Sequence, residues 1–303
     1  HAGTFAGHGG GTALVARDAI DRERGVMPAR NGNVFPLLTG ACDCHMHIYD
    51  RRFPHMPGTL RPALDAGVTD YLTLRWRLGL ERTIVVTPSA YGTDNRVTLD
   101  AVRQLGPSAR AVGVINADAT DAQIRALHAD GVRGARFNLV QSGTTTPQML
   151  GAVAARIAPY GWHVQVHATP EALAGLESVL SSLPVPVVLD HFARIPTTQP
   201  DREHALTILL RMIESGRTWV KLSAPYHAGP GTALAVTGYR ELTRTLVRAA
   251  PERLLWGSDW PHPSETEHPP DDATIFTTVR DWVADAATWS RILTDNPAML
   301  YGF

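Results

Sequence analysis

Histidines and acidic residues that follow short apolar runs are the side chains in this sequence best suited to chemistry. His45 and His47 form a His-x-His pair, and later apolar runs end in His167, His191 and Asp259. Neutral imidazoles and a carboxylate are common ligands of Zn²⁺ and similar divalent ions, and a catalytic site leaves one position for water. A His-x-His pair alone is weak evidence. The five groups together predict a shared active site if the fold brings them to one place.

The elements that must position these residues follow a regular pattern. Short apolar runs alternate with longer segments of helical periodicity, which is typical of βα units repeated around a parallel sheet. Strands are expected at residues 42–49, 83–88, 111–116, 132–140, 162–168, 185–191, 218–223 and 254–259. Helices are expected between them at residues 95–105, 121–129, 147–158, 170–180, 203–215, 233–249 and 272–284.

Eight such units in roughly 260 residues predict one α/β domain, a (β/α)8 barrel of the TIM type. The alternative is an open doubly wound sheet, which usually carries a glycine-rich turn where this chain has His-Met-His. We expect residues 41–303 to form the barrel, with residues 289–303 as a closing C-terminal helix. Residues 1–40 begin with HAGTFAGHGGGT and are expected to be an N-terminal arm or a processed tail.

The composition argues against several classes of partner. The 303 residues are 44% hydrophobic and 19% charged with a formal net charge of -1, so no charge excess favours nucleic acid or an anionic membrane. No apolar run approaches the roughly 20 residues that span a bilayer, and we expect a soluble protein. A disulfide between Cys42 and Cys44 would be strained, so we expect free thiols, as in the reducing cytoplasm. So few cysteines are also compatible with a processed exported chain. A monomer and a homo-oligomer are both compatible with the sequence.

Polar residues end each predicted strand, where a (β/α)8 barrel builds its active site. They are His45 and His47, Ser89, Asn116, Arg136 and Asn138, His167, His191, Ser223 and Asp259. Because side chains two apart on a strand share a face, we expect Asp43, His45 and His47 to point to the barrel axis. Cys42 and Cys44 would then face the helices. Four histidines and one carboxylate therefore converge in the predicted barrel mouth.

These motifs resemble the amidohydrolase superfamily over nearly the whole chain from residue 42 to residue 303. The resemblance is carried by DCHMHIYD (43–50), VQVH (164–167), LDH (189–191), WGSDWPH (256–262) and DNP (295–297). Within the superfamily the chain is most similar to the branch of 2-pyrone-4,6-dicarboxylate lactonase, sugar-acid lactonases and a galactarolactone isomerase. The stretches at residues 88–95, 136–138 and 256–261 are specific to that branch.

The resemblance implies roles for the converging residues. Asp259 would be the general base that takes a proton from water and returns it to the leaving alcohol. His45, His47 and His167 would hold one divalent metal ion, Zn²⁺ by preference, together with Asp259, or else bind the substrate carbonyl directly. Members of this branch differ in metal dependence, and some metal-free relatives have a tyrosine at the position of His167. His191 would orient and polarise the substrate.

Arg136 is expected to bind a substrate carboxylate, because its planar guanidinium matches that group through two hydrogen bonds. The alternative is an ion pair with an interior acid such as Asp43. The stretch at residues 136–138 lacks the lysine or glutamate that bridges two metals in binuclear members, so we expect no two-metal site. The pyrone-dicarboxylate lactonases have arginines where this chain has Ser142 and His227, which makes a hydroxylated sugar-acid lactone at least as well matched. The other candidate substrate-binding residues are Asn138, Ser89, Tyr91, Tyr226, His227 and His262.

The leading hypothesis is therefore a hydrolase that opens a carboxylated lactone with water activated by Asp259, in the breakdown of carbohydrate acids or aromatic compounds. A lactone isomerase would use the same site with a substrate hydroxyl in place of water. A metal-dependent decarboxylase of the same superfamily is a third possibility. A catalytically inactive barrel that only binds a ligand is the fourth, and the intact set of histidines and Asp259 argues against it.

Overall fold

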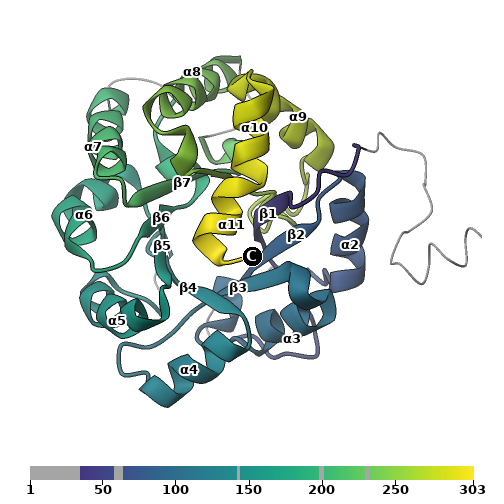
Figure 1. Cartoon of the computed structure of the whole chain (residues 1–303), viewed down its shortest axis with the longest axis vertical. Coiled ribbons are helices and arrows are strands. Elements are labelled where there is room, and N and C mark those ends of the chain that lie inside the picture. Colours follow the sequence, from purple (N-terminus) through teal and green to yellow (C-terminus); the bar gives the residue numbers. More distant parts are fainter. Residues whose placement is uncertain (1–34, 58–63, 142–143, 198–200, 229–232) are drawn as a thin grey trace, which may run out of the picture.

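Eight parallel strands form the centre of the molecule. The computed structural model describes residues 35–57, 64–141, 144–197, 201–228 and 233–303. Each strand pairs with the next along the chain, and helices surround the ring of strands (Figure 1). The strands are β1 (Cys42–Met46), β2 (Arg82–Val86), β3 (Ala109–Gly113), β4 (Val132–Asn138), β5 (His163–His167), β6 (Val187–Leu189), β7 (Thr218–Leu222) and β8 (Leu254–Trp256). The predicted (β/α)8 barrel is confirmed.

Helices follow the strands in the expected places, except that one between β1 and β2 was not predicted and the C-terminal segment differs. They are α2 (Val68–Arg77), α3 (Arg96–Leu105), α4 (Asp121–Ala129), α5 (Leu150–Ile157), α6 (Pro170–Ser182), α7 (Arg202–Glu214), α8 (Ala233–Ala249), α9 (Asp272–Val283), α10 (Ala286–Leu293) and α11 (Asp295–Tyr301). Short 3₁₀ segments are η1 (Ser89–Tyr91), η2 (Gly106–Ser108), η3 (Pro147–Met149), η4 (Ala158–Tyr160), η5 (His191–Arg194), η6 (Pro225–Ala228) and η7 (Pro251–Arg253). Side-chain oxygens of Thr120, Thr169, Asp271 and Asp285 cap four of the helices.

The C-terminal segment differs from the single helix expected at residues 289–303. It forms two helices, α10 and α11, that meet at Thr294. Pro297 explains the break, because a proline ring inside a continuous helix would clash with the carbonyl of Leu293 and would leave it without a hydrogen bond. The closing role is confirmed: α11 places Tyr301 against Trp219 and Leu255 inside the barrel, and the C-terminus lies near the barrel axis (Figure 1).

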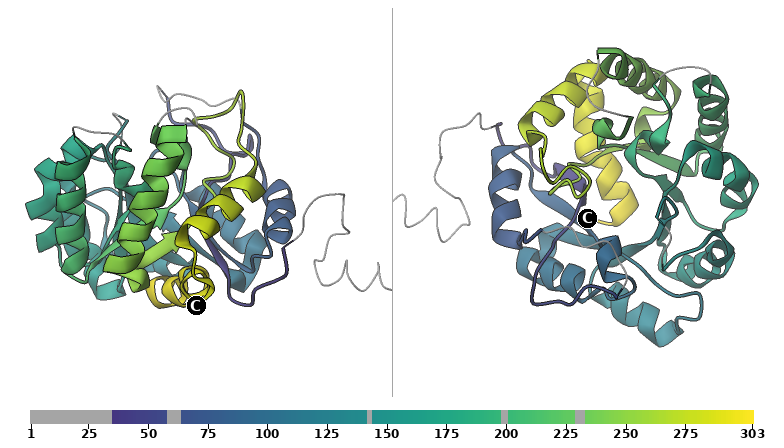
Figure 2. Two further views of the ribbon diagram at one scale, coloured as in Figure 1. Left: turned by 90° about the horizontal axis from the view of Figure 1, so that it is seen from above. Right: turned by 180° about the vertical axis from the view of Figure 1, so that it is seen from behind.

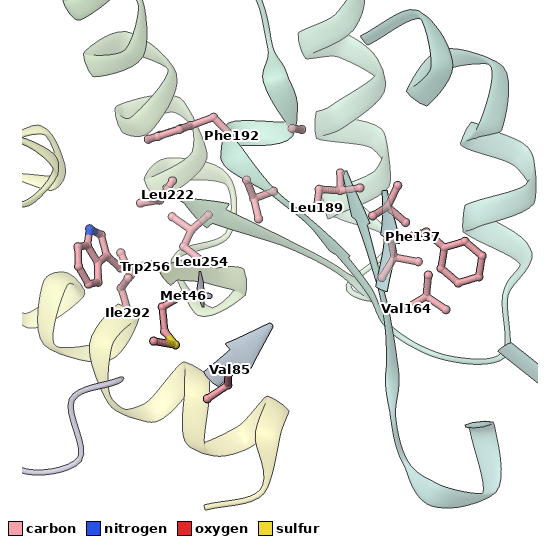
Figure 3. Packing of buried hydrophobic residues seen from close by; sticks show 14 of the residues in the cluster. Met46, Val85, Phe137, Val164, Leu189, Phe192, Leu222, Leu254, Trp256 and Ile292 are labelled. Atoms are coloured by element: carbon pink, nitrogen blue, oxygen red, sulfur yellow. The ribbon is translucent and has the colours of Figure 1, made fainter. Parts of the chain in front are cut away.

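Residues on the outer face of the strands pack against the helices. Figure 3 shows part of this layer, in which Met46, Val85, Val164, Leu189 and Leu222 lie between strands and helices. Continuous burial on both faces is typical of a parallel barrel sheet. The polar residues that point inward therefore stand in a rigid, well-packed frame.

The segment after β8 closes the barrel against β1. The Asp259 N–H donates a hydrogen bond of 2.8 Å to the carbonyl of His45, and the His47 N–H donates one of 2.8 Å to the carbonyl of Trp260. At Gly257 the backbone comes so close that an added Cβ would lie 2.6 Å from the Cβ of His45, which requires glycine there. This closure fixes the distance between the His-x-His pair and Asp259.

The prediction that Asp43 faces the barrel axis and that Cys42 and Cys44 face the helices is wrong. Cys42 and Cys44 lie inside the barrel with Val86 and Leu255, whereas Asp43 accepts hydrogen bonds from Tyr71 of α2 and from Ser258. The pairing of β1 with β2 shifts register between Asp43 and Met46, and such a bulge interrupts the two-residue period. His45, within the shifted stretch, and His47, beyond it, both point inward as expected.

The two ends of the barrel have different roles. Figure 2 shows the C-terminal helices at one end and the loop that follows β8 at the other. At the end that carries the C-terminal helices, the Phe303 ring lies 4.8 Å from the Arg82 guanidinium and 4.7 Å from that of Arg110.

Most of the expected arm at residues 1–40 lies outside the described residues, as does Ser142. No helix in the described part of the chain is both long and apolar enough to cross a bilayer.

Candidate active site

A pocket of about 350 Å³ opens where the strands end. Its lining comes from loops after most of the strands, as expected for a (β/α)8 barrel. The lining residues are His47, Tyr49, Pro88, Ser89, Ala90, Arg136, Asn138, Gln141, His167, His191, His227, Asp259, Pro263, Ser264 and Thr266. Most of the residues singled out from the sequence are therefore brought together, and Tyr49 and Gln141 join them from positions that the sequence pattern did not mark.

The Asp259 carboxylate lies at the centre of the site. Its Oδ1 lies 3.5 Å from His45 Nε2, 3.6 Å from His47 Nε2 and 3.8 Å from His191 Nε2. Asp259 has a φ of 61°, in the left-handed region that side chains other than glycine rarely adopt. Strained backbone of this kind persists where surrounding contacts enforce it, here the hydrogen bonds between the segment after β8 and β1.

The protonation of His47 can be derived from its partners. Its Nδ1 lies 2.8 Å from the carbonyl oxygen of Val86, and a carbonyl only accepts, so Nδ1 carries the hydrogen. Nε2 therefore presents a lone pair toward Asp259 and the pocket. Burial, with the charge of Arg136, holds the pKa of His47 well below its usual range. His47 is thus a neutral nitrogen ligand whose orientation is fixed from behind.

A buried polar network contacts the Nδ1 side of the His45 ring. Its Nδ1 lies 3.2 Å from Asp190 Oδ1 and 3.1 Å from Lys221 Nζ. Lys221 also donates a hydrogen bond of 2.6 Å to Gln165, and Gln165 donates one of 3.0 Å to Asp190. Burial alone would raise the pKa of Asp190, but Lys221 and His45 outweigh it and hold that pKa well below its usual range.

Sequence reasoning did not assign a function to Lys221. The signal was present: Lys221 lies between Trp219 and Ser223 at the spacing of one strand face, in a segment otherwise typical of a buried strand. The Lys221 side chain is 0% exposed. A lysine is almost never buried without a partner, so its position predicts an acid opposite, and Asp190 is that acid.

Three further histidines form a second group beside the first. The ring nitrogens of His167, His191 and His227 lie within 4.8 Å of one another, as do the donor atoms of His45, His47 and Asp259. Desolvation lowers the pKa of His167, His191 and His227, so all three are neutral near pH 7. His167 was expected to join His45, His47 and Asp259, and the structure places it in this second group instead. The donor chemistry of either group fits a divalent ion.

His191 is held by an unusual turn. All four residues of η5, from His191 to Arg194, have φ between 51° and 55°, which is a left-handed turn without glycine. Such a conformation costs roughly 1–2 kcal/mol per residue. The turn directs His191 toward Asp259 and brings the Arg194 guanidinium within 3.4 Å of His167 Nε2. The sequence pattern did not single out Arg194.

Arg136 lies in the pocket wall without an acidic partner. It donates hydrogen bonds to the Thr87 carbonyl at 2.7 Å and to the Ser89 hydroxyl at 3.3 Å, and Asn138 donates to the same hydroxyl at 2.8 Å. Arg136 forms no ion pair with a carboxylate of the described residues, and its buried Nε has no hydrogen-bond partner there. The alternative pairing with Asp43 is therefore not found. A guanidinium that is 5% exposed and unpaired favours a bound anion.

Three candidate substrate-binding residues lie behind the pocket wall. Tyr226 donates a hydrogen bond of 2.6 Å to Asp259 Oδ2, and His262 Nδ1 lies 3.0 Å from the same phenol oxygen. The Tyr91 hydroxyl accepts a hydrogen bond from the Asp50 N–H, and its ring lies 4.8 Å from that of His55. None of the three is among the lining residues, whereas His227 is.

Comparison with known proteins gives a consistent result. The family model described as amidohydrolase matches residues 42–303. The chain is 35% identical to a 2-pyrone-4,6-dicarboxylate hydrolase of Comamonas testosteroni over 88% of this chain and 92% of that protein. It is 32% identical to a D-galactarolactone isomerase of Agrobacterium fabrum over 86% of this chain and 91% of that protein. A solved structure from Agrobacterium tumefaciens matches with a TM-score of 0.80 and 31% identity, over 88% and 97% of the two chains.

Proposed function

This chain belongs to the amidohydrolase family, and from that premise we propose that it is a hydrolase that opens a carboxylated lactone. The observation that supports this most directly is the position of Asp259. Its Oδ1 faces three neutral imidazoles at a pocket that also contains the unpaired guanidinium of Arg136. A base, groups that can stabilise an oxyanion and an anion-binding group are therefore within one cavity.

Asp259 accepts a proton from water while the water oxygen attacks the lactone carbonyl carbon. The carbonyl oxygen becomes an oxyanion, and a ring nitrogen that carries hydrogen stabilises it. His191 can supply that hydrogen from Nε2, because its Nδ1 lies 2.9 Å from the Ser223 hydroxyl and can accept from it. The ring C–O bond then breaks, and Asp259 returns its proton to the alkoxide, which leaves a hydroxy acid.

One divalent ion, Zn²⁺ by preference, fits this site on the chemistry of its donor set. We propose His45, His47 and Asp259 as its ligands, because their donor atoms lie within 4.8 Å of one another and His47 Nε2 carries a lone pair. When bound, such an ion supplies a Lewis acid next to the lactone carbonyl. His167 belongs to the neighbouring group of histidines and would interact with the substrate or with a further ligand.

Acid release from a panel of lactones tests the proposed reaction. We expect a pH indicator to detect hydrolysis of at least one carboxylated lactone, in a panel that contains pyrone dicarboxylate and aldarate and aldonate lactones. A chelator that removes activity, with Zn²⁺ restoring it, would assign His45, His47 and Asp259 to a metal. Activity that survives the chelator would make the same groups substrate-binding residues. No acid release from any member of the panel would contradict a hydrolase.

The pocket favours a lactone with one acid group over one with two. Among the described residues that line it, Arg136 is the one guanidinium. His227 also lines it, but burial lowers the pKa of His227, so it brings no full charge near pH 7. Neutral polar groups of Ser89, Asn138 and Gln141 surround the remaining space and suit the hydroxyls of a sugar acid.

Arg136→Gln is expected to raise KM for a carboxylated lactone by about 10- to 150-fold, with a smaller change in kcat. The estimate follows from the roughly 1.5–3 kcal/mol of a hydrogen bond to a charged group. Steady-state kinetics on a carboxylated lactone and on an uncharged lactone of the same ring size measure it. Arg133→Gln is the matched control, since Arg133 lies on the same strand and donates to the His128 carbonyl away from the pocket. An equal KM change on both substrates would remove Arg136 from carboxylate recognition.

Isomerisation of a lactone is the second candidate, favoured by the 32% identity to a D-galactarolactone isomerase. The same residues would act, with a substrate hydroxyl in place of water as the attacking group. NMR of the products separates the two reactions, because isomerisation changes the ring without release of acid. We place either reaction in the cytoplasm, supported by the two buried cysteines, Cys42 and Cys44, which are free thiols.

A further inference from the structure

A line of contacts connects Asp259 to the start of α9, with a hydrogen bond at each end and the packing of Tyr226 on His262 between them. Tyr226 donates to Asp259 Oδ2 at 2.6 Å, His262 Nδ1 lies 3.0 Å from the Tyr226 oxygen, and His262 Nε2 lies 3.0 Å from Asp272 Oδ1. We infer that Tyr226 is a positioning residue for Asp259 and that His262 and Asp272 hold Tyr226 in place. This inference rests on the proposed role of Asp259 as the general base.

The two oxygens of Asp259 have separate partners. Oδ1 faces the histidines of the site, with His45 Nε2 at 3.5 Å and His47 Nε2 at 3.6 Å. Oδ2 accepts the short hydrogen bond from Tyr226, and His227 Nε2 lies 4.0 Å from the same oxygen. A carboxylate on a two-carbon side chain can rotate, and a fixed donor at one oxygen determines where the other points. Tyr226 thus directs Oδ1 toward the place where water must lose its proton.

The phenol is itself fixed by contacts behind it. Tyr226 belongs to η6, directly after β7, and its ring meets that of His262 nearly edge to face, with centroids 5.6 Å apart. His262 is 2% exposed, and its backbone N–H donates a hydrogen bond of 2.8 Å to the backbone carbonyl of Asp259. A carboxylate only accepts, so His262 Nε2 carries the hydrogen that faces Asp272. The side chain of Asp272, in the first turn of α9, thereby fixes the ring of His262.

A direct role for Tyr226 in substrate binding fits this geometry less well. Tyr226 donates its single hydroxyl hydrogen to Asp259 Oδ2, and the hydroxyl oxygen also faces His262 Nδ1. Neither Tyr226 nor His262 is among the residues that line the pocket. Both residues were expected from the sequence to contact substrate. Their contacts in the structure indicate that they act through the base instead.

Tyr226→Phe removes one hydroxyl and tests the inference. We expect kcat on the best lactone to fall by about 10- to 100-fold while KM stays within about threefold, because the base is misdirected and the pocket is intact. Tyr160→Phe is the matched control. It removes a hydroxyl that donates to Asp121 on the protein surface, and it is expected to leave both constants unchanged.

A second pair of variants acts from the far end of the line. Asp272→Ala removes the partner of His262 and is expected to lower kcat by about 10-fold. Asp272→Asn keeps an acceptor oxygen for His262 Nε2–H and is expected to restore kcat to within about twofold of the parent. A purely structural role would move the melting temperature of both variants together and would give no such rescue.

Crystal structures of the parent and of Tyr226→Phe separate this inference from the proposed function. The Asp259 carboxylate is expected to keep its orientation in the parent and to turn in the variant. An unchanged Asp259 together with an unchanged kcat would overturn the positioning role, and a higher KM with unchanged kcat would make Tyr226 a substrate contact. A parent protein that opens no lactone would contradict the proposed function alone, since the orientation of Asp259 in the variant would still decide the inference.

Discussion

Asp259→Asn is expected to lower kcat by about 1,000- to 10,000-fold and to leave substrate affinity within about tenfold of the parent. The range is that of a general acid–base group, which contributes roughly 10²–10⁴ to the rate, at its upper part because Asp259 both takes and returns the proton. Asparagine has nearly the same shape, and its amide oxygen can still accept from Tyr226. The binding pocket should therefore survive the change while proton transfer is lost. Steady-state kinetics and equilibrium binding of the same lactone measure the two effects.

The control for this variant is Asp281→Asn, at a carboxylate that is exposed on α9 and pairs with Arg280 there. It removes one acid from the chain without a change in the site, and activity should be that of the parent. If Asp259→Asn retains activity within tenfold of the parent, Asp259 is not the base. A loss of binding as large as the loss of turnover would instead assign Asp259 to substrate binding.

Lys221→Met is expected to lower the free energy of unfolding by about 3–5 kcal/mol. The side chains of Lys221 and Asp190 are both 0% exposed and lie 3.3 Å apart. Removal of Lys221 leaves the Asp190 charge in the barrel interior without its cationic partner, which costs more than the pair contributes. Urea unfolding followed by tryptophan fluorescence measures the change, with the slope of the transition compared between parent and variant.

The double variant Lys221→Met with Asp190→Asn is the informative control. It removes both charges and keeps an amide that can still hydrogen-bond to Gln165 and His45, so it should be more stable than Lys221→Met alone. A single variant that loses less than about 1 kcal/mol would show that Asp190 does not depend on Lys221. The same conclusion would follow from a double variant no more stable than the single one.

The order of elements could be predicted from the sequence because the periodicity of a (β/α)8 barrel is strong. Helix α2 was missed, although its buried residues Val68, Tyr71 and Leu74 recur at helical spacing. The orientation of Asp43 could not be obtained from alternation, since a register shift against β2 interrupts the two-residue period. Such a shift depends on pairing between strands and leaves no trace in the spacing of apolar residues.

The candidate site was predictable in part for a similar reason. His45, His47 and Asp259 end strands, and strand ends in a barrel converge wherever the barrel forms. The position of His191, which lies close to both His45 and His167, depends on the left-handed turn at η5. A turn of that kind without glycine cannot be recognised from residue types. The contact of Tyr226 with Asp259 joins two loops that are 33 positions apart in the chain, and loop geometry is not encoded in periodicity.

The buried position of Lys221 also determines how the folded protein reacts with reagents that modify lysine amines. Lys221 is the one lysine among the 28 basic residues Lys and Arg of the chain, and every other member of that set is an arginine. Its amine is enclosed by Asp190, Gln165 and His45 inside the barrel. Acylating and aldehyde reagents that target lysine amines consequently find no lysine at the surface of the folded barrel. Any such label on Lys221 records an opening of the barrel, which makes this single amine a built-in reporter of rare unfolding events.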